Sequence, residues 1–209
     1  GGYWTTDANG NVIAYTGEGT PTDNYIHYDA GNNTLTLHNA TIKEALEYGD
    51  NPPNSLIFGA AIGVLNQNGN AELTIQLVGT NTVSASKGVY VYSSSGTATL
   101  NITGSGSLNA SGFQSGIQVQ SNSNNATLTI QNADVEAEVT SAIGDGVFVQ
   151  AGGSSNASLS VDGGSLTATG KSDYGAGIRY TFGSSSSGSG TPSLTVSGNA
   201  MVKASGGAG

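Results

Sequence analysis

The sequence contains no cysteine, only four prolines, and only five lysine and arginine residues among 209 residues. The absence of cysteine excludes disulfide bonds, a thiol nucleophile and cysteine-ligated metals. Five basic residues against 14 acidic ones, for a net charge of −9, cannot form the basic stripe that follows a phosphate backbone. Nucleic acid is therefore excluded as the main partner. No apolar run approaches the ~20 residues that span a bilayer, so we expect no membrane insertion.

Small polar residues are abundant instead, with 33 Gly, 27 Ser, 22 Thr and 20 Asn. Such a composition is common in disordered chains. However, 36% of the residues are hydrophobic and they recur in a pattern. An apolar–polar–apolar phrase occurs six times, beginning at Leu35, Leu73, Leu100, Leu128, Leu159 and Leu194.

Each phrase belongs to a unit of three short segments in which apolar and polar residues alternate. A second apolar position follows each phrase, at Ile42, Val83, Leu108, Val135, Leu166 and Val202. A third pair precedes the last five phrases, at Ile62/Val64, Val89/Val91, Ile117/Val119, Val147/Val149 and Ile178/Tyr180. Alternation indicates half-buried strands, and the Gly, Asn and Ser residues between them favour turns.

Three strands and three turns in about 27 residues predict one coil of a parallel β-helix. A left-handed hexapeptide helix needs roughly 18 residues per turn, which is too few for these units. We therefore predict an all-β protein, a right-handed three-sided parallel β-helix of about six coils. A β-sandwich is the alternative, but it would not repeat one phrase at the same place in successive units.

The two ends of the chain differ from the repeat. Residues 1–24 predict an N-terminal cap, a hairpin of residues 3–6 and 12–15 around the turn dipeptide Asn9-Gly10. Residues 25–209 form the β-helix, which we expect to be truncated at its C-terminal end because the repeat stops without a cap. Free strand edges on the last coil predict an end-to-end dimer of this chain.

Four stretches, YDAGNNTLTLHNATI, LTIQLVGTNTVSA, LNITGSGSLNASG and GGSLTATG, carry a resemblance. They resemble the repetitive, pectin-lyase-like β-helical surface proteins of gut anaerobes, which are often described as carbohydrate-binding-domain-like. The resemblance covers roughly residues 25–207. It implies an extracellular location on the bacterial cell surface and contact with polysaccharide. The matching residues are core and turn residues, and none of them is a catalytic residue of the family.

Outward side chains of the predicted coils suggest where a ligand would bind. Because side chains alternate along a strand and coils stack about 4.8 Å apart, Gly63, Tyr90, Gln118, Phe148 and Arg179 form one outward column. Tyr92, Gln120 and Gln150 form a second column beside it. Aromatic, amide and guanidinium groups suit a sugar chain. We expect a polysaccharide to contact Tyr90, Tyr92, Gln118, Gln120, Phe148, Gln150 and Arg179. The alternative is that these ladders only stabilise the stacked coils.

The other outward columns carry weaker signals. Hydroxyl and amide groups typical of a solvated sheet form one of them, at Thr36, Thr74, Asn101, Thr129, Ser160 and Thr195. Asp134, Glu136 and Glu138 gather in one coil, where they either hold Ca²⁺ weakly or form a solvated acidic patch. We expect no cofactor and no structural metal.

No group of residues has the composition of a catalytic site. The chain has one arginine, no acid in the column of Arg179, and histidines only at His27 and His38 in the first coil. We expect a non-enzymatic module of the bacterial cell surface that binds polysaccharide or serves as an adhesin-like spacer. The alternatives are a lyase or hydrolase that acts on acidic glycans and a purely structural or self-associating module.

Overall fold

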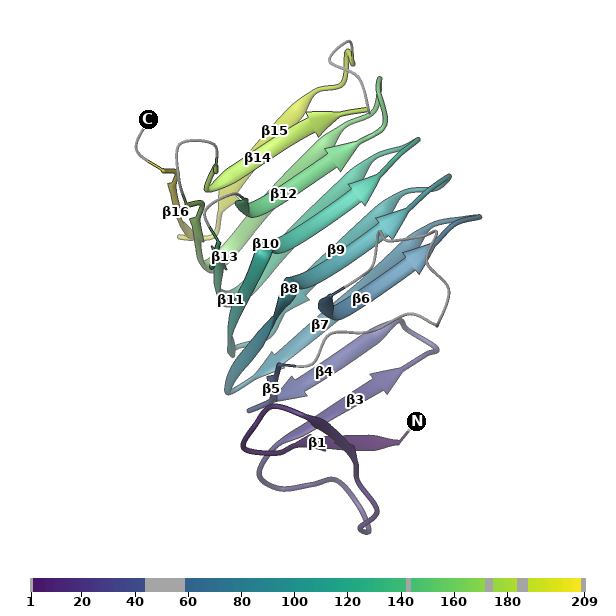
Figure 1. The fold of residues 1–209 in the computed structure, drawn as a ribbon, viewed down its shortest axis with the longest axis vertical. Helices are drawn as coiled ribbons and strands as arrows, with labels where there is room; N and C mark the ends of the chain where they lie inside the picture. The colour runs from purple at the N-terminus through teal and green to yellow at the C-terminus, as the bar shows by residue number, and fades with distance from the viewer. Residues whose placement is uncertain (1, 44–58, 142–143, 172–174, 184–187, 208–209) are drawn as a thin grey trace.

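A computed structural model describes residues 2–43, 59–141, 144–171, 175–183 and 188–207. The protein is a right-handed parallel β-helix whose turns stack along the long axis, with the N-terminus near one end and the C-terminus near the other (Figure 1). None of the described residues belongs to a helix long and apolar enough to cross a membrane. The predicted fold class is confirmed.

Three stacks of parallel strands form the sides of the solenoid. The tyrosine face consists of β6 (Ala60–Asn66), residues 87–93 of β8 (Thr80–Ser93), residues 115–121 of β10 (Ser107–Ser121), β12 (Asp145–Ala151) and β14 (Ile178–Phe182). The threonine face consists of β4 (Thr34–His38), β7 (Ala71–Val78), β9 (Ala98–Thr103), residues 126–131 of β11 (Ala126–Val139), residues 157–162 of β13 (Ala157–Thr169) and β15 (Pro192–Ser197).

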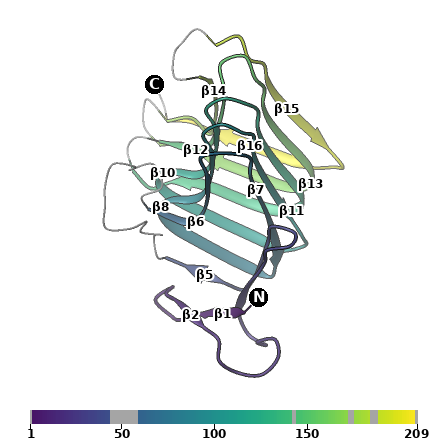
Figure 2. The same cartoon turned by 90° about the vertical axis from the view of Figure 1, so that its right-hand side faces the viewer.

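The third stack is the acidic face. It consists of β5 (Thr41–Ile42), the first parts of β8 and β10, the second parts of β11 and β13, and β16 (Met201–Ser205). After a quarter turn of the molecule, β5 and β16 are seen near opposite ends of the solenoid (Figure 2). Within each turn the chain passes from the threonine face to the acidic face and then to the tyrosine face.

The solenoid has about four turns rather than the six coils that the repeated phrase predicts. The difference arises at the ends. β4 continues only into the two-residue β5 before residues 44–58, which lie outside the described ranges, and β15 and β16 supply two sides of the last turn. The six phrases therefore mark six strands of the threonine face and not six complete turns.

An antiparallel hairpin covers the N-terminal end, as predicted. β1 (Tyr3–Thr6) pairs with β2 (Val12–Ala14), and Gly10 in the connecting turn has a φ of 87°, a conformation that glycine adopts without strain. β3 (Tyr25–Asp29) pairs antiparallel with both β1 and β4. Antiparallel pairing thus extends past residue 24, and the parallel ladder begins at β4.

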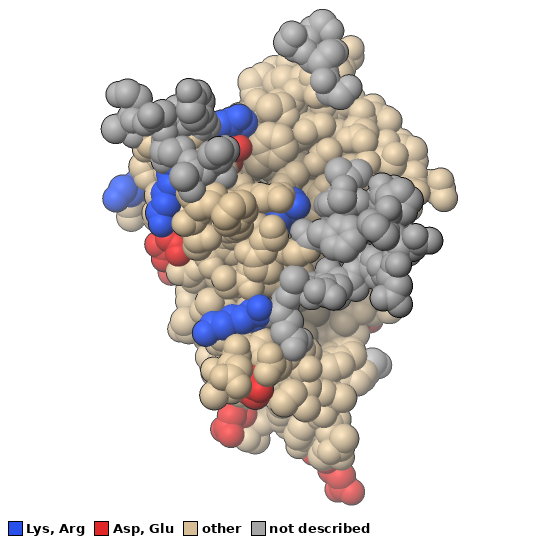
Figure 3. All heavy atoms as spheres, in the orientation of Figure 1, with Lys and Arg blue, Asp and Glu red and all other residues tan. Residues whose placement is uncertain are grey.

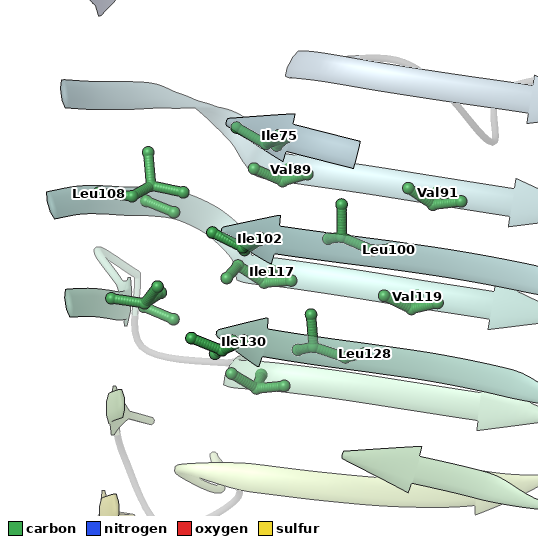
Figure 4. Packing of buried hydrophobic residues seen from close by; sticks show 14 of the residues in the cluster. Ile75, Val89, Val91, Leu100, Ile102, Leu108, Ile117, Val119, Leu128 and Ile130 are labelled. Carbon is green, nitrogen blue, oxygen red and sulfur yellow. The ribbon is translucent and has the colours of Figure 1, made fainter. Parts of the chain in front are cut away.

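Inward side chains form continuous apolar columns. Leu73, Leu100, Leu128 and Leu159 lie opposite one another on successive turns and are buried. Figure 4 shows the same stacking for Ile75, Ile102 and Ile130, and for Val91 and Val119. In these columns, side chains of similar size are removed from water at equivalent positions of successive turns, which fills the interior of the solenoid.

Two positions of the predicted alignment are shifted by two residues. Leu35 lies opposite Ile75 and not Leu73, so that Thr34 rather than Thr36 joins the column of Thr74. On the acidic face Leu108 lies opposite Asn81, whereas Val83 lies opposite Ala110. A slip of two residues leaves every side chain on the same face of a strand, so alternation alone does not detect it.

Asn81 occupies an inward position that apolar residues hold in later turns. Its side chain is fully buried at the corner between the threonine and acidic faces. Its Oδ1 accepts a hydrogen bond from the backbone N–H of Ala40 at 2.9 Å, and its Nδ2 donates to the carbonyl oxygens of Val78 and Ser107, each at 3.2 Å. The amide thus joins three successive turns.

We expect Asn81→Ala to lower the free energy of unfolding by about 2–4 kcal/mol, because buried backbone groups of Ala40 and Ser107 lose their partner. Urea unfolding followed by circular dichroism measures the change. Asn101→Ala, at a half-buried outward position, is the matched control and should change stability by less than about 0.5 kcal/mol. Equal effects of the two substitutions would show that Asn81 is not a structural link between turns.

Candidate functional site

The two predicted outward columns lie on the tyrosine face. Gly63, Tyr90, Gln118, Phe148 and Arg179 are directly opposite one another on five successive strands. The neighbouring column contains Leu65, Tyr92, Gln120, Gln150 and Thr181. The predicted register of this face is confirmed.

The expected exposure of the tyrosines is wrong. Tyr90 is 1% exposed and Tyr92 is 4% exposed, and together with Ala60 they form a small apolar cluster outside the main core, against which Leu65 packs. The Tyr90 and Tyr92 ring centroids are 6.0 Å apart. Neither ring therefore offers an open face on which a sugar could stack.

Both tyrosines hold amide side chains in place. The Tyr90 hydroxyl donates to Gln120 Oε1 at 3.2 Å, and Gln118 Nε2 donates to the same oxygen at 2.9 Å. Gln120 Nε2 donates to Asn122 Oδ1 at 3.1 Å, and Asn122 Nδ2 donates to the Tyr92 hydroxyl at 2.7 Å. Each bond fixes the next amide, so the chain of side chains is oriented as a unit.

The accessible part of the two columns lies further toward the C-terminus. Gln118, Gln120, Phe148 and Gln150 are half-buried, and the Arg179 side chain is 43% exposed. We call these five residues the amide–aromatic surface. It offers hydrogen-bond donors and acceptors around one partly open aromatic ring.

Arg179 has an acidic partner that the sequence analysis missed. Its Nε lies 3.0 Å from Asp145 Oδ1, and the same oxygen accepts a hydrogen bond from the backbone N–H of Ala176 at 2.9 Å. Asp145 is three residues before Phe148, at the start of β12. Asp145 lies in the column of Lys87 and Ser115 at the corner of the turn, so the alternation of side chains along a strand does not predict its contact with Arg179.

Lys87 is the second group that the sequence analysis missed. It lies opposite Ala60 and Ser115 at the start of the tyrosine face, and its Nζ is 5.0 Å from the centre of the Tyr90 ring. The residue is only 5% exposed, and this burial lowers the pKa of the Lys87 ammonium. Burial, reinforced by the neighbouring Tyr92, raises the pKa of the Tyr90 phenol above its ordinary value.

The acidic residues of the third face are engaged with neighbouring turns. Ser165 Oγ donates to Asp134 Oδ1 at 2.7 Å, and Asn109 Nδ2 donates to Glu136 Oε2 at 3.2 Å. Successive carboxylates on one side of a strand are about 7 Å apart, which is too far for one cation. Among the described residues no group of three His, Asp or Glu side chains is placed to hold a metal ion.

Other hollows and aromatic contacts lie away from the amide–aromatic surface. A polar hollow of about 480 Å³ lies on the acidic face beside Asn109, Asp134 and Glu136. An apolar hollow of about 530 Å³ lies at the N-terminal end, lined by Trp4, Tyr28, Leu35 and Ile62 among others. The two histidines stack on tyrosine rings, His27 on Tyr3 at 4.7 Å and His38 on Tyr25 at 5.0 Å. On the face drawn in Figure 3, charged side chains are few, and in the upper part of the view blue and red ones lie next to one another.

The fold and this surface define the protein as a right-handed β-helix that displays an ordered amide–aromatic surface. Comparisons with protein-family models, with curated proteins and with solved structures found no match to the chain. The resemblance to surface proteins of gut anaerobes therefore rests on the sequence phrases and stays a prediction.

We expect Tyr90→Phe to make the protein less sensitive to alkali. The phenol ionises near pH 10 in the unfolded chain but only at higher pH in the folded protein, so the free energy of unfolding falls as pH rises above 10. At pH 11 this loss is about 1–2 kcal/mol for one buried tyrosine. Urea unfolding at pH 8 and pH 11 measures the free energy of unfolding at each pH. Between the two pH values it should fall by about this amount less in Tyr90→Phe than in the parent protein.

The contributions of other titrating groups to the free energy of unfolding cancel when the variant is compared with the parent protein, because both contain these groups. Burial raises the pKa of Tyr180 to about 12, which adds to the alkaline loss in each protein. The lowered pKa of Lys87 has the opposite effect on the free energy of unfolding, which it makes rise with pH. The folded protein releases the proton of this buried ammonium at a lower pH than the unfolded chain, in which lysine titrates near 10.5. An identical decrease in Tyr90→Phe and the parent protein would contradict the burial of Tyr90.

Proposed function

We propose that the chain is a non-enzymatic β-helix module of the bacterial cell surface that binds polysaccharide through the amide–aromatic surface. The observation that carries the proposal is the fixed orientation of the Gln118 and Gln120 amides beside the partly open Phe148 ring. Donors and acceptors that are already oriented lose little conformational entropy when they bind sugar hydroxyls. The binding surface is shorter than the sequence predicts, because Tyr90 and Tyr92 on the preceding turn are buried and support it by hydrogen bonds.

Several weak contacts on the surface of a rigid solenoid suit this function. A polysaccharide offers the same hydroxyl groups many times, so several modest contacts add up to useful retention. Arg179 lies near the end of the surface and favours an acidic sugar locally, whereas the net charge of −9 opposes anionic ligands at long range. Binding of an acidic glycan should therefore improve when salt screens the long-range repulsion.

An enzyme acting on acidic glycans is the rival function. Arg179 and Asp145 would be its candidate residues, but their side chains are paired with each other. Such an activity would release reducing ends or unsaturated products from polygalacturonate, which colorimetric and ultraviolet assays detect. Product formation above a heat-treated control would replace the binding proposal by this one.

Phe148→Ala and Gln150→Ala should weaken glycan binding without unfolding the protein, because both side chains are only half-buried. We expect retention by the best ligand of a soluble polysaccharide panel to fall by roughly three- to tenfold in the double variant, as measured by affinity gel electrophoresis. Phe148 and Gln150 are preferred to Tyr90, whose removal would disturb the buried cluster.

The matched control is Thr129→Ala with Ser160→Ala, two outward positions on the threonine face of neighbouring turns. The control should bind as the parent protein does. Equal retention of parent, double variant and control would place binding elsewhere, and no retention of the parent by any polysaccharide would remove the proposed function.

Self-association is a second candidate function, supported by the last turn. Among the described residues β14 pairs only with β12, and β15 and β16 pair only with β13, so each has an edge without a strand partner. Leu194 and Val196 belong to inward columns but are exposed there. Unpaired edges and apolar side chains favour pairing with another strand, and a second copy of the chain supplies one.

We expect the chain to form dimers at high concentration and Val196→Lys to abolish them, because a charge would enter the apolar end of the solenoid. Sedimentation velocity over a hundredfold concentration range measures the change. Thr195→Lys places the same charge on the outward side of the same strand and should leave the dimer intact. A monomeric parent protein at every concentration would refute self-association.

A further inference from the structure

A β-bulge occurs where β10 passes from the acidic face to the tyrosine face. The register between β8 and β10 shifts at this corner, so that Ser86 of β8 faces both Phe113 and Gln114 of β10. Bulges change the direction of side chains and are frequent next to functional sites. Here the bulge directs Phe113 away from the solenoid, and its side chain is 62% exposed.

The next turn holds the backbone of this bulge. Thr140 donates a backbone hydrogen bond to the carbonyl oxygen of Gly112 at 2.8 Å, and Ser141 Oγ donates to the carbonyl oxygen of Phe113 at 2.5 Å. The backbone at Phe113 is therefore fixed although its ring is open to solvent. Because the Phe113 ring is exposed, it buries little apolar surface and adds little to the stability of the fold. Stability therefore does not explain why a phenylalanine occupies this position.

The surroundings of Phe113 are polar and hydroxyl-rich. Ser86 lies on the turn before, and Thr140 and Ser141 lie on the turn after. The other large exposed hydrophobic residues of the described chain belong to the cap hairpin, the end of β7 and the last turn: Val12, Ile13, Val78, Leu194, Val196 and Met201. As far as the described residues go, which leave out 142–143, Phe113 is thus not part of a broad apolar patch of the kind that protein interfaces use.

The bulge is connected to the amide–aromatic surface through Ser115. This residue lies two positions after Phe113, and its Oγ donates to Gln118 Oε1 at 3.4 Å. Along β10 the chain therefore offers the exposed ring of Phe113 and, further on, the half-buried amides of Gln118 and Gln120. Ser115 between them is buried and supports the Gln118 side chain. The distance from Phe113 to Gln118 is at most about 17 Å along an extended strand.

We infer that Phe113 is the exposed aromatic platform of the carbohydrate site, and that a bound glycan runs along β10, across the axis of the solenoid. This inference rests on the proposed function. The apolar C–H face of a pyranose ring stacks on Phe113, and later sugar units donate and accept hydrogen bonds at Gln118 and Gln120. The span requires an oligosaccharide of several units. The burial of Tyr90 and Tyr92 leaves no aromatic platform on the preceding turn, which disfavours a path along the axis.

The test compares Phe113→Ala, Phe113→Trp and the parent protein in affinity gels that contain soluble xylan, galactomannan, mixed-linkage β-glucan or polygalacturonate. We expect Phe113→Ala to weaken retention by the preferred polysaccharide roughly three- to tenfold, and Phe113→Trp to restore it. Val78→Ala removes an exposed apolar side chain at the end of β7 and should retain full binding. The melting temperatures of all variants should agree within about 2 °C, since the replaced side chains are exposed.

The outcomes separate this inference from the proposed function. If the parent protein is retained and Phe148→Ala lowers retention while Phe113→Ala does not, the site exists but Phe113 is not its platform. If Phe113→Ala lowers the affinity for a hexasaccharide while Gln118→Ala and Gln120→Ala leave it unchanged, the extended path along β10 is wrong. If none of the four polysaccharides retains the parent protein, both proposals fail.

Discussion

Parallel hydrogen bonding between successive turns is the constraint on which the rest of this structure depends. In the middle of the solenoid, each strand of a face pairs with the strand of the turn before and of the turn after. Equivalent residues are therefore stacked at the strand spacing of about 4.8 Å. Inside the solenoid this stacking fills the core with columns of Leu, Ile and Val. Outside it aligns side chains from distant parts of the sequence into continuous columns.

The same constraint explains why an outward residue is not always an accessible one. Tyr90 and Tyr92 point away from the core, yet Ala60 and Tyr92 pack with Tyr90 in a small second cluster. Their hydroxyl groups still find partners in the amides of the next turn, so burial costs them no hydrogen bond. The tyrosines thereby support a polar surface that lies one turn further along the axis. Rigid support of this kind distinguishes an ordered binding surface from a solvated strand.

Variation between turns occurs at the corners, and one of these is the corner between the acidic and tyrosine faces. The strands themselves must keep the register, whereas a corner accepts an extra residue without disturbing the ladder on either side. The bulge at Phe113, the ion pair between Arg179 and Asp145, and the buried Lys87 all lie at this corner or beside it. A new side chain can thus be presented there while the hydrogen bonds between turns stay intact.

The sequence by itself determined the fold class, the cap hairpin and the members of the two outward columns, because strand alternation and the recurring Leu-x-Ile phrase are local properties. It left the register uncertain by two residues at Leu35 and Leu108, since a slip of two keeps every side chain on the same face. Only the tertiary structure decided where Asp145, Lys87 and Phe113 lie. At the corners of a turn the alternation of inward and outward side chains is interrupted, and residues of neighbouring turns come together there. The burial of Tyr90 was decided there as well, because exposure depends on what packs over a residue and not on the direction in which its strand points it.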